Sequence, residues 1–284
     1  GGYVNNWNFS NSQINKIINS LGKSNIDIIE LGYLNDREGV NLNSTLFDSL
    51  KSVDIAIGEL DLTSQLVIMI DLFTVDVDKL PHKSKTRVDG IRLAFHQKDT
   101  NEAVLASKKI ISLGYQLFFQ PMVTKNYNGN EFTALIKKAN VLNVYAFYVV
   151  DSFGSMTLSE FQKYINLADN NLDKGIKLGY HSHNNMQLAF SNAIDLCTSS
   201  IDREVILDSS IYGMGRGAGN LNTELIIDYL NTTSKYKYEV MPLLGVIDEI
   251  LAYYFKKNSY GRRPDDGVVC LAYKRRRGSV GRRR

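Results

Sequence analysis

Short apolar runs alternate with helix-length amphipathic stretches from residue 26 to residue 230 of this 284-residue chain. Runs rich in β-branched and aromatic residues predict seven strands, at 26–31, 66–72, 90–95, 116–120, 144–150, 177–180 and 204–207. Helical patterns lie between or after them, at 42–52, 100–113, 131–140, 157–170, 186–200 and 223–230. This alternation favours parallel βαβ units. It predicts an α/β fold, and the spacing suits a closed TIM (β/α)8 barrel better than an open doubly wound sheet.

Basic residues are concentrated at the end of the chain. The formal net charge is +3, yet residues 256–284 hold 11 of the 33 Lys and Arg residues, and the rest of the chain carries a net charge of −6. We therefore expect a folded domain at 1–255 and a basic tail at 256–284 that is disordered or unnatural. A nucleic-acid-binding arm is the alternative for such a cluster. It is disfavoured because only Tyr260 and Tyr273 offer an aromatic platform there.

Cysteine usage and hydropathy point to a cytoplasmic protein. Cys197 and Cys270 are far apart and belong to no disulfide or thiolate metal motif. No apolar stretch reaches the roughly 20 residues that cross a bilayer, so no membrane association is expected.

Polar residues follow nearly every predicted strand. In a parallel barrel the carboxyl ends of the strands meet at one face, where such barrels keep their active sites. Helix capping is the alternative explanation for any single position. The residues concerned are Glu30, Asp71, Gln120, Asp151, His181, His183 and Asp208.

Two of the four histidines stand two residues apart, at His181 and His183. Side chains alternate along a strand, so both imidazoles can face one divalent ion such as Mn²⁺, Mg²⁺, Co²⁺ or Zn²⁺. Such an ion can polarise a carbonyl and stabilise an enolate, which making or cleaving an adjacent carbon–carbon bond requires. The alternative is that two polar histidines merely end a strand.

A glycine-rich segment, Gly213-Met214-Gly215-Arg216-Gly217-Ala218-Gly219-Asn220, follows the last strand. Its glycines let the backbone pass close to a ligand, and Asn220 offers an amide oxygen that can complete a site for a hard ion. A flexible turn is an open alternative. A dinucleotide-binding loop is disfavoured because the spacing is not Gly-x-Gly-x-x-Gly.

Three motifs together resemble the DRE-TIM metallolyase superfamily, which includes 3-hydroxy-3-methylglutaryl-CoA lyase and 4-hydroxy-2-oxovalerate aldolase. They are Asp151-Ser152-Phe153-Gly154, His181-Ser182-His183-Asn184-Asn185 and the segment 213–220. The resemblance covers about residues 1–250 and makes residues 1–255 a catalytic domain. It implies a metal bound by His181, His183 and Asn220, with Glu30 as an active-site acid. Asp151, at the head of the first motif, is a further catalytic candidate.

The opening residues 1–7 resemble the segment that follows the first strand in the aldolase-like branch. The resemblance implies that the first strand and its Arg-Asp pair would precede Gly1, so the barrel is expected to lack that strand in this chain. Tyr3 falls where the branch has a catalytic base. An unperturbed phenol, with a pKa of about 10, is a poor base near neutral pH.

The leading hypothesis is a divalent-metal-dependent aldolase or lyase acting on a small 2-oxo acid or hydroxy acid through a metal-stabilised enolate. A Claisen-type synthase, which condenses an acyl-CoA with a 2-oxo acid, is the second interpretation. An inactive barrel fragment that binds metal or a partner is the third, and homo-oligomerisation is left open. We interpret Arg87 and Arg92 as surface or packing residues, with anion binding as the alternative.

Overall fold

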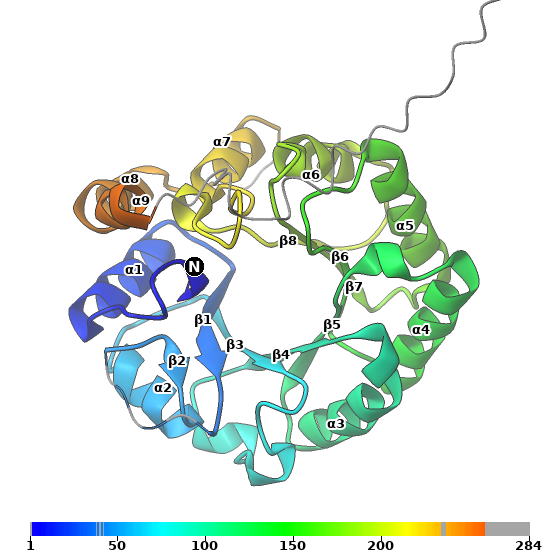
Figure 1. The fold of residues 1–284 in the computed structure, drawn as a ribbon, viewed down its shortest axis with the longest axis horizontal. Helices are drawn as coiled ribbons and strands as arrows, with labels where there is room; N and C mark the ends of the chain where they lie inside the picture. The colour runs from blue at the N-terminus through cyan, green and yellow to red at the C-terminus, as the bar shows by residue number, and fades with distance from the viewer. Residues whose placement is uncertain (1, 38, 40, 42, 234–236, 259–284) are drawn as a thin grey trace, which may run out of the picture.

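The computed structural model describes residues 2–37, 39, 41, 43–233 and 237–258, and in these the sheet is entirely parallel. The strand order is β2-β1-β3-β4-β5-β6-β7-β8. Figure 1 shows the strands curling round a central axis with the helices outside them, so the fold is a curled half-barrel of the TIM type. The α/β prediction is confirmed. The strands are β1 (Ile28–Leu34), β2 (Leu46–Phe47), β3 (Gln65–Asp71), β4 (Gly90–Phe95), β5 (Gln116–Pro121), β6 (Ala146–Asp151), β7 (Lys177–Ser182) and β8 (Val205–Leu207).

The sheet has one open seam, between β8 and β1. Within the described residues β8 pairs only with β7, and β1 pairs with β3 and, at Tyr33 and Leu34, with the two-residue β2. All seven predicted strands are present, and β2 is an eighth that the sequence pattern did not predict.

The helices of the βα units cover the outer face of the sheet. Three helices, α1, α4 and α5, begin with capping boxes at Ser10, Asn128 and Thr157, which satisfy the first backbone amides of the helix. The α-helices are α1 (Asn11–Lys23), α2 (Leu50–Ile57), α3 (Thr100–Ser112), α4 (Gly129–Leu142), α5 (Leu158–Asn171), α6 (Ala189–Thr198), α7 (Thr223–Thr233), α8 (Met241–Val246) and α9 (Ala252–Asn258). A π-helical turn, η7 (Ile247–Leu251), joins α8 to α9, and short 3₁₀ turns occupy Gly2–Val4, Val77–Lys79, Lys83–Lys85, Gln97–Asp99, Thr124–Asn126 and Ile211–Gly213.

The helix predicted at 42–52 is wrong in its first half, because α2 begins only at Leu50. In this segment side-chain oxygens accept hydrogen bonds from nearby backbone amides, which in a helix would donate to backbone carbonyls. Asn41 Oδ1 accepts from the amide of Asn43 and Ser44 Oγ accepts from that of Leu46, both at 3.0 Å. Such local bonds compete with helix formation. The helix starts after the capping residue Ser49.

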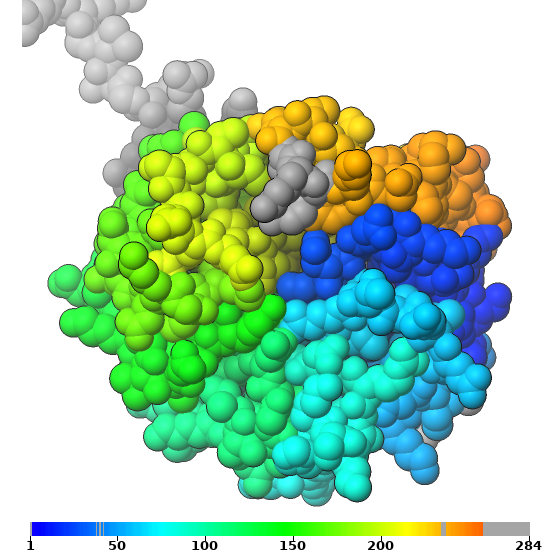
Figure 2. Space-filling model, turned by 180° about the vertical axis from the view of Figure 1, so that it is seen from behind, coloured from blue at the N-terminus to red at the C-terminus, as the bar shows by residue number. Residues whose placement is uncertain are grey.

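Helix α1 and helices α8 and α9 lie side by side on the outside of the barrel in both Figure 1 and Figure 2. Lys16 of α1 forms an ion pair with Glu249, and the Tyr254 hydroxyl donates to the carbonyl of Asn8 at 3.1 Å. Helix α9 runs through the predicted domain boundary at 255, and the rest of the predicted basic tail, 259–284, lies outside the described residues. None of the described helices is long and apolar enough to span a bilayer.

Aromatic side chains fill the middle of the barrel wall and interior. Phe118 and Tyr148 are fully buried with Val67, Ala146 and Val150 in a cluster of their own. A separate and larger core packs the outer face of the sheet against the helices. The interior cluster is the floor on which the polar site described next is built.

Candidate active site

A cavity of about 1530 Å³ opens at the carboxyl ends of the strands and continues along the seam between β1 and β8. Polar side chains line it at the rim, and apolar side chains of β1, α1 and α7 line it along the seam. Five of the six predicted site residues line this cavity, namely Tyr3, Glu30, His181, His183 and Asn220.

His181 lies on β7 and His183 directly after it, and the centroids of their rings are 5.6 Å apart. Two imidazoles on one ion can have centroids up to about 6.4 Å apart, because each ligand nitrogen lies about 2.1 Å from the metal. His181 and His183 are therefore near enough to share an ion.

Each of these rings uses Nδ1 in a hydrogen bond with the protein. His183 Nδ1 donates to the carbonyl of Arg216 at 3.2 Å. Burial, together with the nearby His181 and Arg216, lowers the pKa of His183 to about 3, so this ring is neutral at pH 7. A neutral imidazole that donates through Nδ1 keeps the lone pair of Nε2 for a metal.

His181 is held in the same way, by a carboxylate. Its Nδ1 lies 2.9 Å from Asp208 Oδ2. Burial alone would raise the pKa of the Asp208 carboxyl, but the charge of Arg92 and the hydrogen bond from His181 lower it to about 2. Because Asp208 is ionised, it accepts and His181 Nδ1 donates. No described residue hydrogen bonds to Nε2 of either histidine.

Asn220 supplies a buried amide oxygen, Oδ1, that has no hydrogen-bond partner within the described structure. Its backbone forms an antiparallel bridge with His183, which brings the amide to the histidine pair. A Cβ atom on Gly215 would lie 2.5 Å from this oxygen, so glycine is needed there for Asn220 to keep its position. A buried unpaired acceptor normally requires a partner, and a cation is a suitable one.

These donors fit a divalent ion, although they form an incomplete set. The described residues contain no group of three or more His, Cys, Asp and Glu side chains placed to hold a metal. Two imidazoles and one amide oxygen leave further coordination positions for substrate, water or another ligand. This mixed N and O set suits borderline or hard ions.

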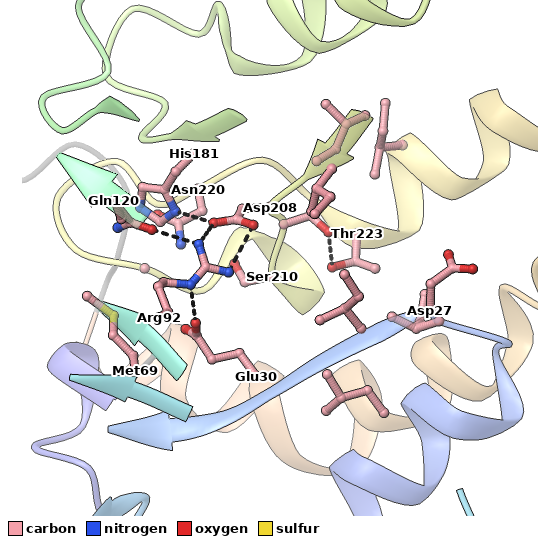
Figure 3. Close-up of a pocket in the computed structure, with 18 of the residues that line it drawn as sticks. Asp27, Glu30, Met69, Arg92, Gln120, His181, Asp208, Ser210, Asn220 and Thr223 are labelled. Atoms are coloured by element: carbon pink, nitrogen blue, oxygen red, sulfur yellow. Dashed lines mark hydrogen bonds and ion pairs between the residues drawn. The ribbon is translucent and has the colours of Figure 1, made fainter. Parts of the chain in front are cut away.

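The interpretation of Arg92 as a surface residue is wrong, because its guanidinium lies inside the barrel with 6% of its side chain exposed (Figure 3). Nε lies 2.5 Å from Glu30 Oε2, and Nη1 donates to Gln120 Oε1 at 2.7 Å. Nη1 and Nη2 form a two-point ion pair with Asp208. The guanidinium carbon also lies 4.7 Å from the ring centre of Tyr148.

Tyr3 lies at the mouth of the cavity, about half exposed, and its ring packs at a tilt against Trp7 with a centroid separation of 4.9 Å. The guanidinium of Arg216 covers its ring at 5.4 Å. Burial of the hydroxyl and the charge of Asp71 raise the pKa of Tyr3 despite the opposing charge of Arg216.

Asp151 is the one predicted site residue that the structure places away from the others. Its two carboxylate oxygens accept from the backbone amides of Ser155 and Met156, at 3.0 and 2.9 Å. The carboxylate is buried and shapes the loop that carries Ser152 and Phe153 to the cavity.

The three sequence motifs meet through their loops. Asn185 Nδ2 donates to the carbonyl of Phe153 at 2.6 Å, and Asn185 Oδ1 accepts from the amide of Ala218 at 3.3 Å. Gly154 adopts a φ of +58°, and a Cβ atom there would lie 2.5 Å from the amide nitrogen of Asn185. Asn185, in the histidine motif, therefore connects the loop at Phe153 with the glycine-rich loop at Ala218.

Comparison with known proteins places the chain in a family. The sequence pattern of the HMGL-like family matches residues 1–241. The 4-hydroxy-2-oxovalerate aldolase of Bacillus thuringiensis (strain Al Hakam) is 22% identical over 258 residues, which cover 89% of this chain and 73% of that protein.

Solved structures agree on the fold. The N-terminal domain of a Bacteroides vulgatus protein provisionally assigned as an aldolase superposes with a TM-score of 0.77 and 26% identity, covering 96% of this chain and 88% of that one. The HMG-CoA lyase of Brucella melitensis superposes with a TM-score of 0.67 and 14% identity, covering 86% and 91%. The chain belongs to the HMGL-like family of the DRE-TIM superfamily, in its aldolase-like branch of carbon–carbon lyases.

Proposed function

We propose that this chain is a divalent-metal-dependent aldolase or lyase that cleaves or forms a carbon–carbon bond in a small 2-oxo acid or hydroxy acid. The observation that carries the proposal is the pair of imidazoles, each held through Nδ1 by a hydrogen bond, beside the unpaired amide oxygen of Asn220. The similarity to a 4-hydroxy-2-oxovalerate aldolase supports the substrate class. A cytoplasmic location stays a prediction.

His181, His183 and Asn220 would hold the ion, with Mn²⁺ or Mg²⁺ as the first choice and Co²⁺ or Zn²⁺ as alternatives. A divalent ion bound there would supply Lewis acidity toward a carbonyl oxygen. Arg216 O and Asp208 orient the two rings through Nδ1. The apolar wall of the seam and the buried aromatic floor keep water away from part of the cavity.

Tyr3 is the proposed proton carrier of the site. Its raised pKa keeps the phenol protonated at neutral pH, which suits donation of a proton to a developing carbanion or oxyanion better than removal of one. Glu30 stays a proposed active-site acid, fixed on one side by Arg92. We assign Asp151 to loop shape, because both of its oxygens are bonded to backbone amides.

Arg216 is the proposed contact for the substrate carboxylate. It lines the cavity beside His183 and Tyr3, and its guanidinium makes no ion pair with a described residue. The other cavity arginine near the rim, Arg92, is neutralised by Glu30 and Asp208. A charge-assisted pair with Arg216 is therefore available to an anionic substrate, and Arg216→Ala should raise KM more than it lowers kcat.

The test is release of pyruvate from 4-hydroxy-2-oxovalerate, with Mn²⁺ and after chelation, in the unmodified chain and in His181→Ala and His183→Ala. His82→Ala is the matched control, because His82 caps the turn at Lys83–Lys85 and does not line the cavity. We expect metal-dependent release that both site variants abolish and the control retains. Release that survives chelation would refute the metal mechanism. Condensation of an acyl-CoA with a 2-oxo acid would favour the synthase, and metal binding without turnover would favour the inactive fragment.

A further inference from the structure

Arg92 is a buried cation whose charge is fully used inside the protein. It lies in the middle of β4, whose six residues are all buried. Its Nη atoms donate to Gln120 and Asp208, and its Nε forms an ion pair with Glu30. The faces of Phe118 and Tyr148 lie beside its guanidinium. Arginine is rarely buried unless it is paired, and here the pairing is with two carboxylates from different strands.

The two carboxylates come from the two sides of the open seam. Glu30 is on β1 and Asp208 directly follows β8, and the described parts of these strands share no backbone hydrogen bonds. Arg92 contacts both carboxylates, as Figure 3 shows. A side-chain ion network therefore spans the seam that backbone pairing leaves open.

Asp208 carries this network to the candidate metal site. Its Oδ2 accepts from His181 Nδ1, and its Oδ1 accepts from Arg92 Nη2 at 3.1 Å and from the Tyr148 hydroxyl at 3.2 Å. Without Arg92, Asp208 would be a buried carboxylate with no opposite charge, which is strongly unfavourable. The carboxylate would have to turn toward water, and His181 would lose the acceptor that orients it.

We propose that Arg92 is a positioning residue: by clamping Asp208 across the open seam, it fixes the ring of His181 so that Nε2 is left as the ligand atom. The inference rests on the proposed metal site. It assigns Asp208 to orientation of a ligand rather than to the ion itself, since both of its oxygens are already bonded to described side chains. Outer partners of this kind change metal affinity by about 10- to 100-fold.

The first experiment uses the metal-free protein. Nitrogen NMR of ¹⁵N-histidine-labelled protein at pH 8.5, where an ordinary histidine is neutral, reports which ring nitrogen carries the proton. We expect His181 to be protonated on Nδ1 in the unmodified chain and to become a mixture of tautomers in Arg92→Met. Arg87→Met is the control, because Arg87 binds the carbonyls of Gly58 and Leu60 away from the cavity. An unchanged His181 tautomer in Arg92→Met would overturn the proposal.

The second experiment measures Mn²⁺ affinity by equilibrium dialysis in a double-mutant cycle. Arg92→Met should weaken binding by about 10- to 100-fold in the unmodified chain and also in the His183→Ala background. In the His181→Ala background its effect should disappear to within about twofold, which is the usual scatter of such cycles, because the two residues are coupled. An equal loss in the His181→Ala background would show that Arg92 acts through general stability, and the clamp would be refuted.

A milder variant covers the case in which Arg92→Met does not fold. Tyr148→Phe removes one hydrogen bond to Asp208 and keeps the ring under Arg92. It should shift the His181 tautomer and the Mn²⁺ affinity in the same directions by a smaller amount, again with no effect on affinity in the His181→Ala background. If His181→Ala and His183→Ala both leave Mn²⁺ affinity unchanged, the proposed function fails, and the NMR result still decides the clamp by itself.

Discussion

The β4–β7 side of the barrel and the seam between β8 and β1 are held together by different forces. On the first side, β4 and β5 pair along six residues, β6 and β7 along another six, and β5 and β6 at two. At the seam β8 has only three paired residues, all on its β7 side, and polar side chains connect it with β1 through Arg92.

This difference separates stability from chemistry. Backbone ladders and close-packed aromatic rings do not depend on the ionisation state or on a bound ligand. At the seam a buried ion network links the two edges, and the net stability that such a network contributes is small, because desolvation offsets the attraction between the charges. The candidate ligands His181 and His183 lie on β7 and directly after it, at the edge of the β4–β7 side. Asp208, which follows β8 at the seam, contacts only His181 of the two.

The largest expected effect is a loss of stability on the β4–β7 side. Phe132 of α4 is fully buried and packs against Phe147 and Tyr164, with ring centroids 5.5 and 5.2 Å away. Phe132→Ala should lower the free energy of unfolding by about 3–5 kcal/mol, measured by urea denaturation. Ile206→Ala, in the partly buried β8, should cost less than half as much. Equal losses of unfolding free energy would show that the seam is as well packed as the β4–β7 side.

A smaller effect is expected at the glycine-rich loop, and it sharpens the assignment of Asn220. Gly215→Ala places a methyl group against Asn220 Oδ1 and should weaken Mn²⁺ binding by about tenfold, with little change in thermal unfolding. Gly129→Ala is the control, because a Cβ atom there meets no neighbour within 4 Å. Calorimetric titration checks both variants, and equal affinities in the two would remove Asn220 from the site.

The smallest effect concerns a helix N-cap on the β4–β7 side. Thr157→Ala removes the N-cap of α5 and should cost about 1 kcal/mol at pH 7. Although burial alone would raise it, hydrogen bonds from Thr157 and Lys125 hold the pKa of Glu160 below its usual 4.5. Ionised Glu160 therefore favours the folded state above about pH 4.5, and this contribution is lost as the pH falls through the lowered pKa. Urea denaturation at pH 7 and pH 3 should show the difference between Thr157→Ala and the unmodified chain narrowing at low pH; a constant difference would contradict the role of Glu160.

The alternation of strands and helices could be predicted from sequence because hydrophobic periodicity is a local property, and the same is true of the His181–His183 spacing. The segment 41–49 could not, because asparagine and serine side chains there replace the bonds of a helix. Helices α1, α8 and α9 were not predicted either.

The buried ion pairs of Arg92 were missed for a different reason. Its partners lie 62 and 116 residues away in the sequence, and only the curvature of the sheet brings them together. One signal was available: an arginine within an otherwise apolar strand such as 90–95 must have a buried partner if both faces of the strand are covered. Asp151 shows the converse: the end of its strand was predicted, but the pattern could not show that the backbone amides of Ser155 and Met156 would bind its carboxylate.

The triple junction at Asn185 sets a limit on how this chain can vary. Since one amide group bonds to the loops at Phe153 and Ala218 at once, inserting or deleting a residue in any of the three loops would pull a metal-ligand candidate out of register. Engineering of new substrate preference should therefore leave these loop lengths alone and work through side-chain exchange on the wall of the cavity.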